Sequence, residues 1–241
     1  MAAVALPNLA ESQDAAPRDT ATSAQENVTA ADATSTDCAA GFGPVVAKRI
    51  QKRYDAVRDM QADFAQTSVA STFRGEPLMS PDRKTGTVVF AKPGMMRWTY
   101  VAPEASEVVS NGSMLWIYDV EGQSVTKLAV TAGFLSGAAV QFLLGDGQIL
   151  ESFEVAARTC EPRRVELDLI PRADATYERL GLVADPETGE IIATSVLDLF
   201  GNLTRIEFSA IKVNQNPKAS TFEFVVPDGV ELLEYEGTPS R

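Results

Sequence analysis

Residues 85–130 read TGTVVFAKPGMMRWTYVAPEASEVVSNGSMLWIYDVEGQSVTKLAV, and this stretch indicates the fold class. Short runs rich in Val, Phe, Trp and Tyr alternate with KPG at 92–94, NG at 111–112 and EG at 121–122. These are residues that tight hairpin turns require, because glycine and asparagine tolerate backbone angles that other residues avoid. The stretch therefore predicts an antiparallel meander.

Both faces of the predicted meander carry large apolar side chains. Side chains alternate across a strand, so residues 96, 98 and 100 share one face and their odd-numbered neighbours share the other. The strand at 114–118 repeats the pattern. An antiparallel sheet with one face in water carries polar residues on that face. We therefore expect cover on one side of this sheet, and either a core or a cavity on the other.

The composition of the chain excludes several classes of function. The 241 residues carry a formal net charge of −12, which argues against the basic face that a nucleic-acid partner needs. Histidine is absent, so the usual general base and the commonest metal ligand are both missing. Two cysteines alone cannot form a thiolate zinc site. We expect neither a nucleic-acid partner nor a metal.

Cys38 and Cys160 have three interpretations: a structural disulfide, two reduced thiols or, for Cys38, a lipid attachment point. The Ser-Thr-Asp sequence before Cys38 lacks the small and apolar residues that precede a lipidated cysteine. Secreted character favours the disulfide, which would join the start of the folded region to a mid-chain strand.

The chain divides into a predicted disordered leader, residues 1–37, and a single predicted domain, residues 38–241. The leader is dominated by Ala, Ser, Thr and acidic side chains and contains no aromatic residue. From Pro44, apolar residues recur at helical spacing. No stretch has the ~20 apolar residues of a membrane-spanning helix.

Strands are predicted on both sides of the meander. A period of two begins near Met60, and later strands are expected at 153–157, 165–170, 179–183, 191–197, 203–213 and 222–226. A parallel sheet would need crossover helices, and the sequence contains only two good helical segments. We therefore predict a mostly β fold, an antiparallel sheet with a few covering helices.

The second helical segment, residues 132–144, has an unusually broad apolar face. Its apolar side chains at helical spacing are Phe134, Leu135, Ala138, Ala139, Phe142 and Leu143. Gly145 offers the left-handed cap that ends many helices. The segment is either a static helix that seals a core or a movable cover over an apolar surface.

The patterns of common enzymes are missing. No serine lies in a Gly-x-Ser-x-Gly elbow, and no histidine is available as its base. The glycines at 145 and 147 follow a predicted helix instead of preceding one, so they do not form a phosphate loop. Glu166 and Asp168 are interpreted as a solvated strand face rather than as paired catalytic acids. We expect no catalysis and no cofactor, which leaves a binding surface.

Four motifs occur in order along the chain: GTVVFAKPGMMRWTY at 86–100, VSNG leading to LWIYD at 109–119, DLFGNLT at 198–204, and FEF with VPDGV at 222–230. Together they resemble the LolA family of periplasmic outer-membrane lipoprotein carriers. The resemblance covers residues 44–234, which is the whole predicted folded body.

The resemblance implies an incomplete, strongly curved antiparallel β-barrel covered by helices, with an apolar cavity for the acyl chains of lipoproteins. Such a carrier works in the periplasm as a monomer. It receives cargo from an inner-membrane ABC exporter and passes it to an outer-membrane acceptor lipoprotein. The alternative is a lipid-sensing regulatory domain of the same fold that binds an envelope-stress signalling protein.

The resemblance also implies roles for individual residues. The basic residue before the Pro-Gly turn, usually arginine in the family, latches the covering helices and is Lys92 here. A lysine cannot make the forked hydrogen bonds of a guanidinium. The cavity lining is assigned to Met96, Trp98, Tyr100, Met114 and Trp116, or else to their opposite-face neighbours, and the cover to Phe134, Leu135, Phe142 and Leu143.

Overall fold

The structure, a computed structural model, describes residues 38–71, 82–130 and 147–235. The strands are β1 (Asp59–Val69), β2 (Asp82–Ala91), β3 (Met95–Ala102), β4 (Ser106–Asn111), β5 (Met114–Asp119), β6 (Ser124–Ala129), β7 (Phe153–Glu161), β8 (Arg164–Pro171), β9 (Tyr177–Ala184), β10 (Ile191–Asp198), β11 (Leu203–Val213) and β12 (Glu231–Tyr235). The helices are α1 (Phe42–Asp55), α3 (Ile149–Ser152) and the 3₁₀ turn η1 (Ala219–Phe222).

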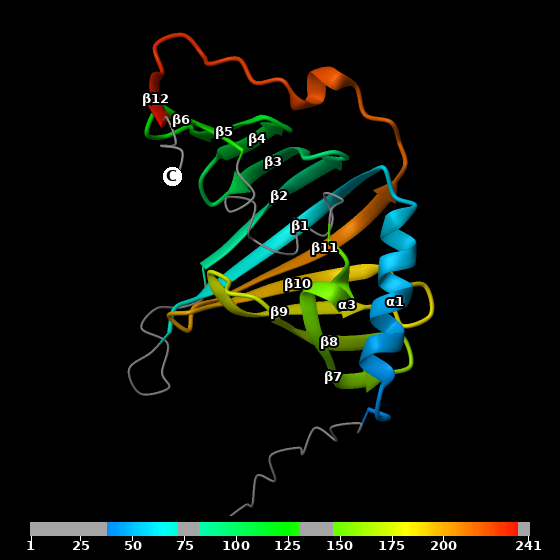
Figure 1. Cartoon of the computed structure of the whole chain (residues 1–241). Coiled ribbons are helices and arrows are strands. Elements are labelled where there is room, and N and C mark those ends of the chain that lie inside the picture. Colours follow the sequence, from blue (N-terminus) through cyan, green and yellow to red (C-terminus); the bar gives the residue numbers. More distant parts are fainter. Residues whose placement is uncertain (1–37, 72–81, 131–146, 236–241) are drawn as a thin grey trace, which may run out of the picture. The chain divides into compact units, whose positions relative to one another are not determined.

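All twelve strands belong to one sheet, in the order β12-β6-β5-β4-β3-β2-β1-β11-β10-β9-β8-β7 (Figure 1). Every neighbouring pair is antiparallel except β12 and β6, which run parallel. The two outermost strands, β12 and β7, each have one neighbour in this order, so the sheet is curved but open. The predicted mostly β class with few helices is confirmed.

The helix α1 forms because its apolar residues repeat every four positions. Val46 and Ile50 are fully buried, and Tyr54 is 2% exposed. Two basic residues in the last turn suit the negative end of the helix dipole. The helix packs against β7 and α3.

The turn between β9 and β10 approaches α1 closely at Gly189. Its φ of 72° lies in the left-handed region, and a Cβ there would come within 2.9 Å of the carbonyl oxygen of Arg49. Glycine is therefore required both by the backbone angle and by the helix above it. Arg53 in α1 forms an ion pair with Glu190 beside this turn.

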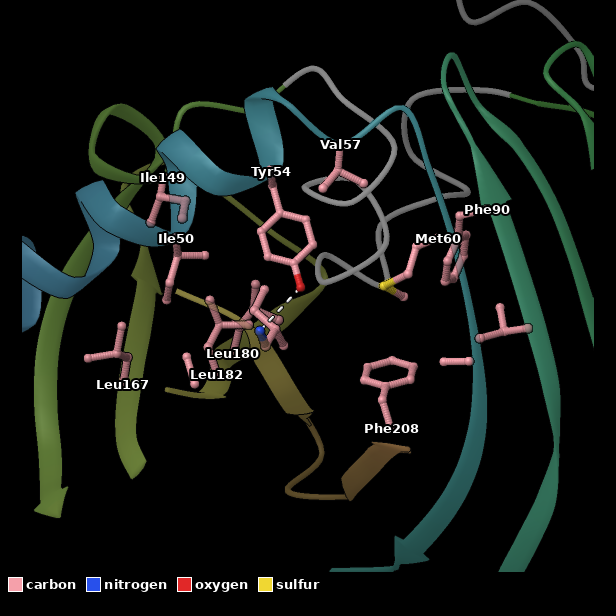
Figure 2. Close-up of a cluster of buried hydrophobic side chains, with 14 of the residues drawn as sticks. Ile50, Tyr54, Val57, Met60, Phe90, Ile149, Leu167, Leu180, Leu182 and Phe208 are labelled. Carbon is pink, nitrogen blue, oxygen red and sulfur yellow. Dashed lines mark hydrogen bonds between the residues drawn. The ribbon is translucent and has the colours of Figure 1, made fainter. Parts of the chain in front are cut away.

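The hydrophobic core lies between α1 and the sheet face beneath it (Figure 2). Leu167, Leu180 and Leu182 of β8 and β9 lie under Ile50 and Ile149 in this cluster. The hydroxyl of Tyr54 accepts a hydrogen bond of 3.2 Å from the backbone N–H of Ile191. This bond ties the last turn of α1 to the start of β10.

Residues 214–230, here called the C-terminal strap, lead from β11, in the middle of the sheet, to the edge strand β12 (Figure 1). The buried carboxylate of Asp59 accepts hydrogen bonds from the backbone N–H groups of Gln215 (2.6 Å) and Asn216 (3.1 Å). Arg97 of β3 donates to the carbonyl oxygens of Thr221 (2.7 Å) and Glu223 (2.9 Å). The strap is therefore held at its start and its middle.

The prediction of a strand at 222–226 was wrong. Residues 219–222 form the turn η1, residues 223–226 have no regular structure, and the last strand is β12 at Glu231–Tyr235. The alternating pattern FEFVV is real, but a strand needs a neighbour to accept its backbone hydrogen bonds. Here the guanidinium of Arg97 takes two of the carbonyl oxygens instead.

A disulfide joins Cys38 to Cys160, with the two Cα atoms 5.4 Å apart. It ties the residues before α1 to β7. The leader predicted at 1–37 and the cover segment predicted at 132–144 lie outside the described residues. Within the described residues no helix has the length and apolar character needed to cross a membrane.

Candidate functional site

Strand pairing defines one face of the sheet that points toward the core. Met96 pairs with Ser110, and Ser110 pairs with Leu115. One step along, Trp98 pairs with Val108, and Val108 pairs with Ile117. Residues that pair directly lie on the same face, so these two rows belong together. We call this the inner face of β1–β5.

The inner face is apolar and largely buried. Met96 and Trp98 are 7% and 6% exposed, and Leu115 is 2% exposed. Tyr100 is half-buried and packs against the same core cluster. Three of the five predicted lining residues, Met96, Trp98 and Tyr100, are therefore brought together here.

An aromatic cluster occupies the middle of the inner face. The ring of Trp98 lies 4.8 Å from that of Phe64, 5.6 Å from Phe90 and 6.3 Å from Tyr100, measured between centroids. Phe64 meets Tyr100 edge to face at 5.0 Å. Gly86, the residue between them in the pairing, leaves room for this contact, since a Cβ there would lie 2.9 Å from the Phe64 ring.

Met114 and Trp116 lie on the opposite, outer face. Trp116 pairs with Val109, which pairs with Arg97, and the indole stacks on Phe224 of the strap at 6.2 Å. The structure therefore does not bring these two residues together with Met96 and Trp98. Their inner-face neighbours are Leu115 and Ile117, the alternative that the sequence left open.

The four predicted cover residues lie outside the described residues: Phe134, Leu135, Phe142 and Leu143. Their role stays a prediction.

Lys92 connects the turn after β2 to the end of α1. Its Nζ donates a 2.6 Å hydrogen bond to the carbonyl oxygen of Tyr54, and its backbone N–H donates to Arg58 O at 2.9 Å. The carbonyl groups at a helix C-terminus attract cations, because they lack partners within the helix. Lys92 therefore contacts the helix that covers the core. Its role as a latch stays a prediction.

Two polar groups of the aromatic cluster are buried with the rings. The hydroxyl of Tyr100 donates to Oε1 of Gln66 at 3.0 Å, and burial raises the pKa of this phenol to about 12. The phenol is therefore neutral at physiological pH. The indole Nε1 of Trp98 is buried, and among the described residues no acceptor lies within hydrogen-bond distance of it.

A cavity of about 300 Å³ opens at the end of the sheet where α3, β7, β8 and β9 meet. Ile149 is part of the core cluster, and Phe153 and Tyr177 pack against it. Glu151, Arg172 and Asp174 provide polar groups at the same cavity. The cavity is thus lined by both polar and apolar groups.

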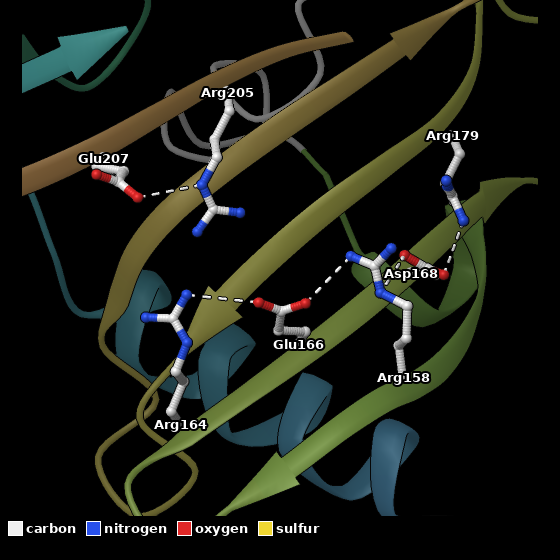
Figure 3. Close-up of polar contacts among 7 residues, drawn as sticks. All are labelled: Arg158, Arg164, Glu166, Asp168, Arg179, Arg205 and Glu207. Atoms are coloured by element: carbon white, nitrogen blue, oxygen red, sulfur yellow. Dashed lines mark hydrogen bonds and ion pairs between the residues drawn. The ribbon is translucent and has the colours of Figure 1, made fainter. Parts of the chain in front are cut away.

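The carboxylates considered as acid-base candidates form ion pairs on the outer face (Figure 3). Glu166 contacts Arg158 (3.2 Å) and Arg164 (3.4 Å), and Asp168 contacts Arg179 (2.9 Å). Each carboxylate faces away from the core, because the residues between them on β8 are buried. Among the described residues no group of three His, Cys, Asp or Glu side chains is placed to hold a metal.

Sequence reasoning missed Phe64, Phe90 and Gln66 as members of the site. Phe64 and Phe90 are apolar residues of alternating strands, which is a signal for burial but not for which cluster they join. Gln66 carried no signal at all, because a lone polar residue near the end of a strand is ordinary.

A curved antiparallel sheet with a continuous apolar and aromatic inner face defines a class of proteins that hold hydrophobic molecules. Comparison with known sequences identifies the family. Residues 55–225 match the family described as outer membrane lipoprotein carrier protein LolA, and the chain belongs to it. This is a family of carriers and not of enzymes, and its cargo is lipoprotein.

Two relatives illustrate the match. An outer-membrane lipoprotein carrier protein from Methylococcus capsulatus is 30% identical over 190 residues, which cover 77% of this chain and 86% of the relative. One from Ralstonia nicotianae is 29% identical over 179 residues, covering 74% and 82%.

Solved structures are more distant. A LolA superfamily protein from Nitrosomonas europaea has a TM-score of 0.42 and 12% identity, covering 74% of this chain and 97% of that one. An uncharacterised conserved protein from Thermus thermophilus has a TM-score of 0.48 and 10% identity, covering 79% and 97%. The family assignment rests on sequence.

Proposed function

We propose that this protein carries lipoproteins through the periplasm by holding their acyl chains against the inner face of β1–β5. The observation that carries the proposal is the unbroken apolar surface that runs from Phe64 across Trp98 to Ile117. Hiding a chain of ~14 methylenes at about 0.8 kcal/mol each is worth on the order of 11 kcal/mol. A dry lining of this kind is what makes a soluble carrier possible.

The carrier takes its cargo from an inner-membrane ABC exporter and releases it to an outer-membrane acceptor lipoprotein. Both transfers require that binding be reversible, so opening the apolar interior must offset part of the gain from burying the acyl chain. The hydrogen bond from Lys92 to the end of α1 supports this proposal, because it is a contact between the sheet and a covering helix that can be exchanged. The protein acts as a monomer in both steps.

The direct test is the release of lipoprotein from spheroplasts by purified protein, together with mass spectrometry of acyl material that copurifies with it. We expect stoichiometric release and bound acyl-modified lipoprotein. Release no greater than that caused by an unrelated acidic protein would contradict the proposal.

A matched pair of variants tests which face binds the acyl chain. Met96→Gln places an amide on the inner face, whereas Met114→Gln makes the same change on the outer face two strands away. A polar group without a partner in a dry site costs on the order of 1–3 kcal/mol, so we expect at least fivefold weaker acyl binding for Met96→Gln and no change for Met114→Gln.

Urea unfolding of both variants is the control for stability. Equal loss of binding in the two variants, or loss only in Met114→Gln, would contradict the assignment of the inner face.

A further inference from the structure

The indole N–H of Trp98 is an unpaired donor inside an apolar surface. Trp98 is 6% exposed, and its Nε1 has no acceptor among the described residues. A buried donor without a partner costs about 1–3 kcal/mol, so buried polar groups in native proteins nearly always have one. The group is therefore expected to find its partner in another state of the protein.

The described neighbours of Trp98 do not supply this acceptor. Val88 and Val108 pair with it on either side and carry only methyl groups. The rings of Phe64 and Phe90 are its closest aromatic contacts. The side-chain oxygens of Tyr100 and Gln66 are hydrogen-bonded to each other, and neither lies within hydrogen-bond distance of the indole. A molecule that binds here must be apolar and must bring an oxygen that accepts a hydrogen bond.

We propose that Trp98 Nε1 donates a hydrogen bond to the carbonyl oxygen of an acyl ester in the bound lipid. The inference rests on the proposed function. It adds that Trp98 sets the position of the acyl carbonyl group along the inner face. An ester carbonyl accepts without donating, so it satisfies the indole and leaves no further group unpaired. The carbonyl end of the chain, and not its methyl end, therefore lies at the aromatic cluster.

Two other lipid oxygens fit less well. A hydroxyl would bring its own donor into the apolar cluster, where it would need a second partner. A free carboxylate would bring a charge, and Arg97, the cation next to Trp98 in the sequence, points to the outer face and binds the strap. Esters are thus favoured over fatty acids and over ether-linked chains.

The test compares a diester with a diether of the same chain length. Dioctanoylglycerol and dioctylglycerol differ only in the two carbonyl groups, and each can displace a fluorescent acyl probe from the full chain. One hydrogen bond of about 1 kcal/mol corresponds to roughly fivefold tighter binding of the diester. We expect this preference in the wild type and its loss in Trp98→Phe.

Tyr100→Phe is the matched control, because it removes a different polar group from the same cluster. We expect it to keep the preference for the diester. If Trp98→Phe leaves a cavity that weakens all binding, replacing Trp98 by benzothienylalanine removes the N–H at nearly constant shape. A preference that survives this replacement would overturn the proposal.

The indole proton gives a second readout that does not depend on affinity. The chain has two tryptophans, so in Trp116→Phe the remaining indole N–H signal belongs to Trp98. We expect this signal to move downfield on addition of the diester and to stay upfield with the diether.

The outcomes separate the two levels of inference. If neither lipid displaces the probe, the proposed acyl-binding function fails. If both bind equally to the wild type and the indole signal responds alike, the carbonyl contact is refuted while acyl binding stands.

Discussion

Tyr54, at the end of α1, has a buried ring whose hydroxyl accepts a hydrogen bond from the backbone N–H of Ile191. Burial raises the pKa of its phenol to about 12, against an ordinary value of 10.0. Above pH 10 the unfolded chain loses this proton while the folded chain keeps it. Stability from this group is therefore complete below pH 10 and is lost as the pH rises toward 12.

The alkaline stability of the protein tests this directly. We expect the free energy of unfolding to fall by about 2–3 kcal/mol between pH 10 and pH 12 on account of Tyr54. Tyr54→Phe should show a shallower decline in this window, while losing stability at every pH because Ile191 N–H loses its acceptor. Urea unfolding from pH 8 to 12 measures both; parallel curves for the two proteins would contradict the assignment.

Lys92 donates one side-chain hydrogen bond to the last turn of α1, as expected for a latch. We predict that Lys92→Met lowers the free energy of unfolding by ~1 kcal/mol and speeds amide hydrogen exchange in the last turn of α1. Lys92→Arg restores a donor and should keep exchange slow. Unchanged exchange in Lys92→Met would show that the 2.6 Å bond to Tyr54 O contributes nothing to holding the helix.

The C-terminal strap is an element defined by its anchors and not by its own hydrogen bonding. Between β11 and β12 its only regular structure is the four-residue turn η1. Two side chains of the sheet hold the segment in place: Asp59 accepts hydrogen bonds from its backbone N–H groups, and Arg97 donates hydrogen bonds to its carbonyl oxygens. Phe222 of the segment is also buried, with 2% of its surface exposed. Removing an anchor should therefore free the strap without unfolding the sheet.

Arg97→Met tests this element. It removes two hydrogen bonds to the strap and the ion pair with Glu107. We expect proteolysis within residues 214–230 to become at least several-fold faster, with a stability loss of about 1–3 kcal/mol. Arg205→Met is the control, because Arg205 pairs only with the exposed Glu207 among the described residues and should change stability by less than about 0.5 kcal/mol. Equal cleavage rates in both variants would contradict the role of Arg97.

At the scale of the whole molecule, one disulfide joins the residues before α1 to the edge strand β7. Cys38 and Cys160 are 122 residues apart in the sequence and lie before α1 and in β7. Closing a loop of this length stabilises the folded state by roughly 5 kcal/mol in the chain-entropy model.

Reduction is therefore expected to lower the melting temperature by several degrees. The double variant Cys38→Ser, Cys160→Ser should melt at the same temperature as the reduced protein and should not respond to reductant. Two free thiols titrated in the denatured, unreduced protein would refute the disulfide.

Local patterns predicted the elements well. The turn residues at 92–94, 111–112 and 121–122 fall between β2 and β3, β4 and β5, and β5 and β6. These signals are local because a tight turn depends on the backbone angles of two or three adjacent residues. The apolar repeat of α1 is local for the same reason.

The face of the sheet on which Met114 and Trp116 lie could not be predicted from local sequence patterns. The β3–β4 pairing joins even-numbered Met96 to even-numbered Ser110, but the β4–β5 pairing joins Ser110 to odd-numbered Leu115. A register that differs by one residue moves every side chain of a strand to the other face. Residue types alone do not reveal this parity, because both faces of β5 are apolar.

The amino-acid sequence by itself determined the mostly β class, the turns, the family and the absence of histidine chemistry, since each depends on residue identity or short-range pattern. Only the tertiary structure decided which tryptophan faces the core, that Arg97 holds the strap in place of a strand, and that the indole of Trp98 has no partner among the described residues. These three depend on strand register and on contacts between residues far apart in the chain, and such contacts exist only once the sheet has formed.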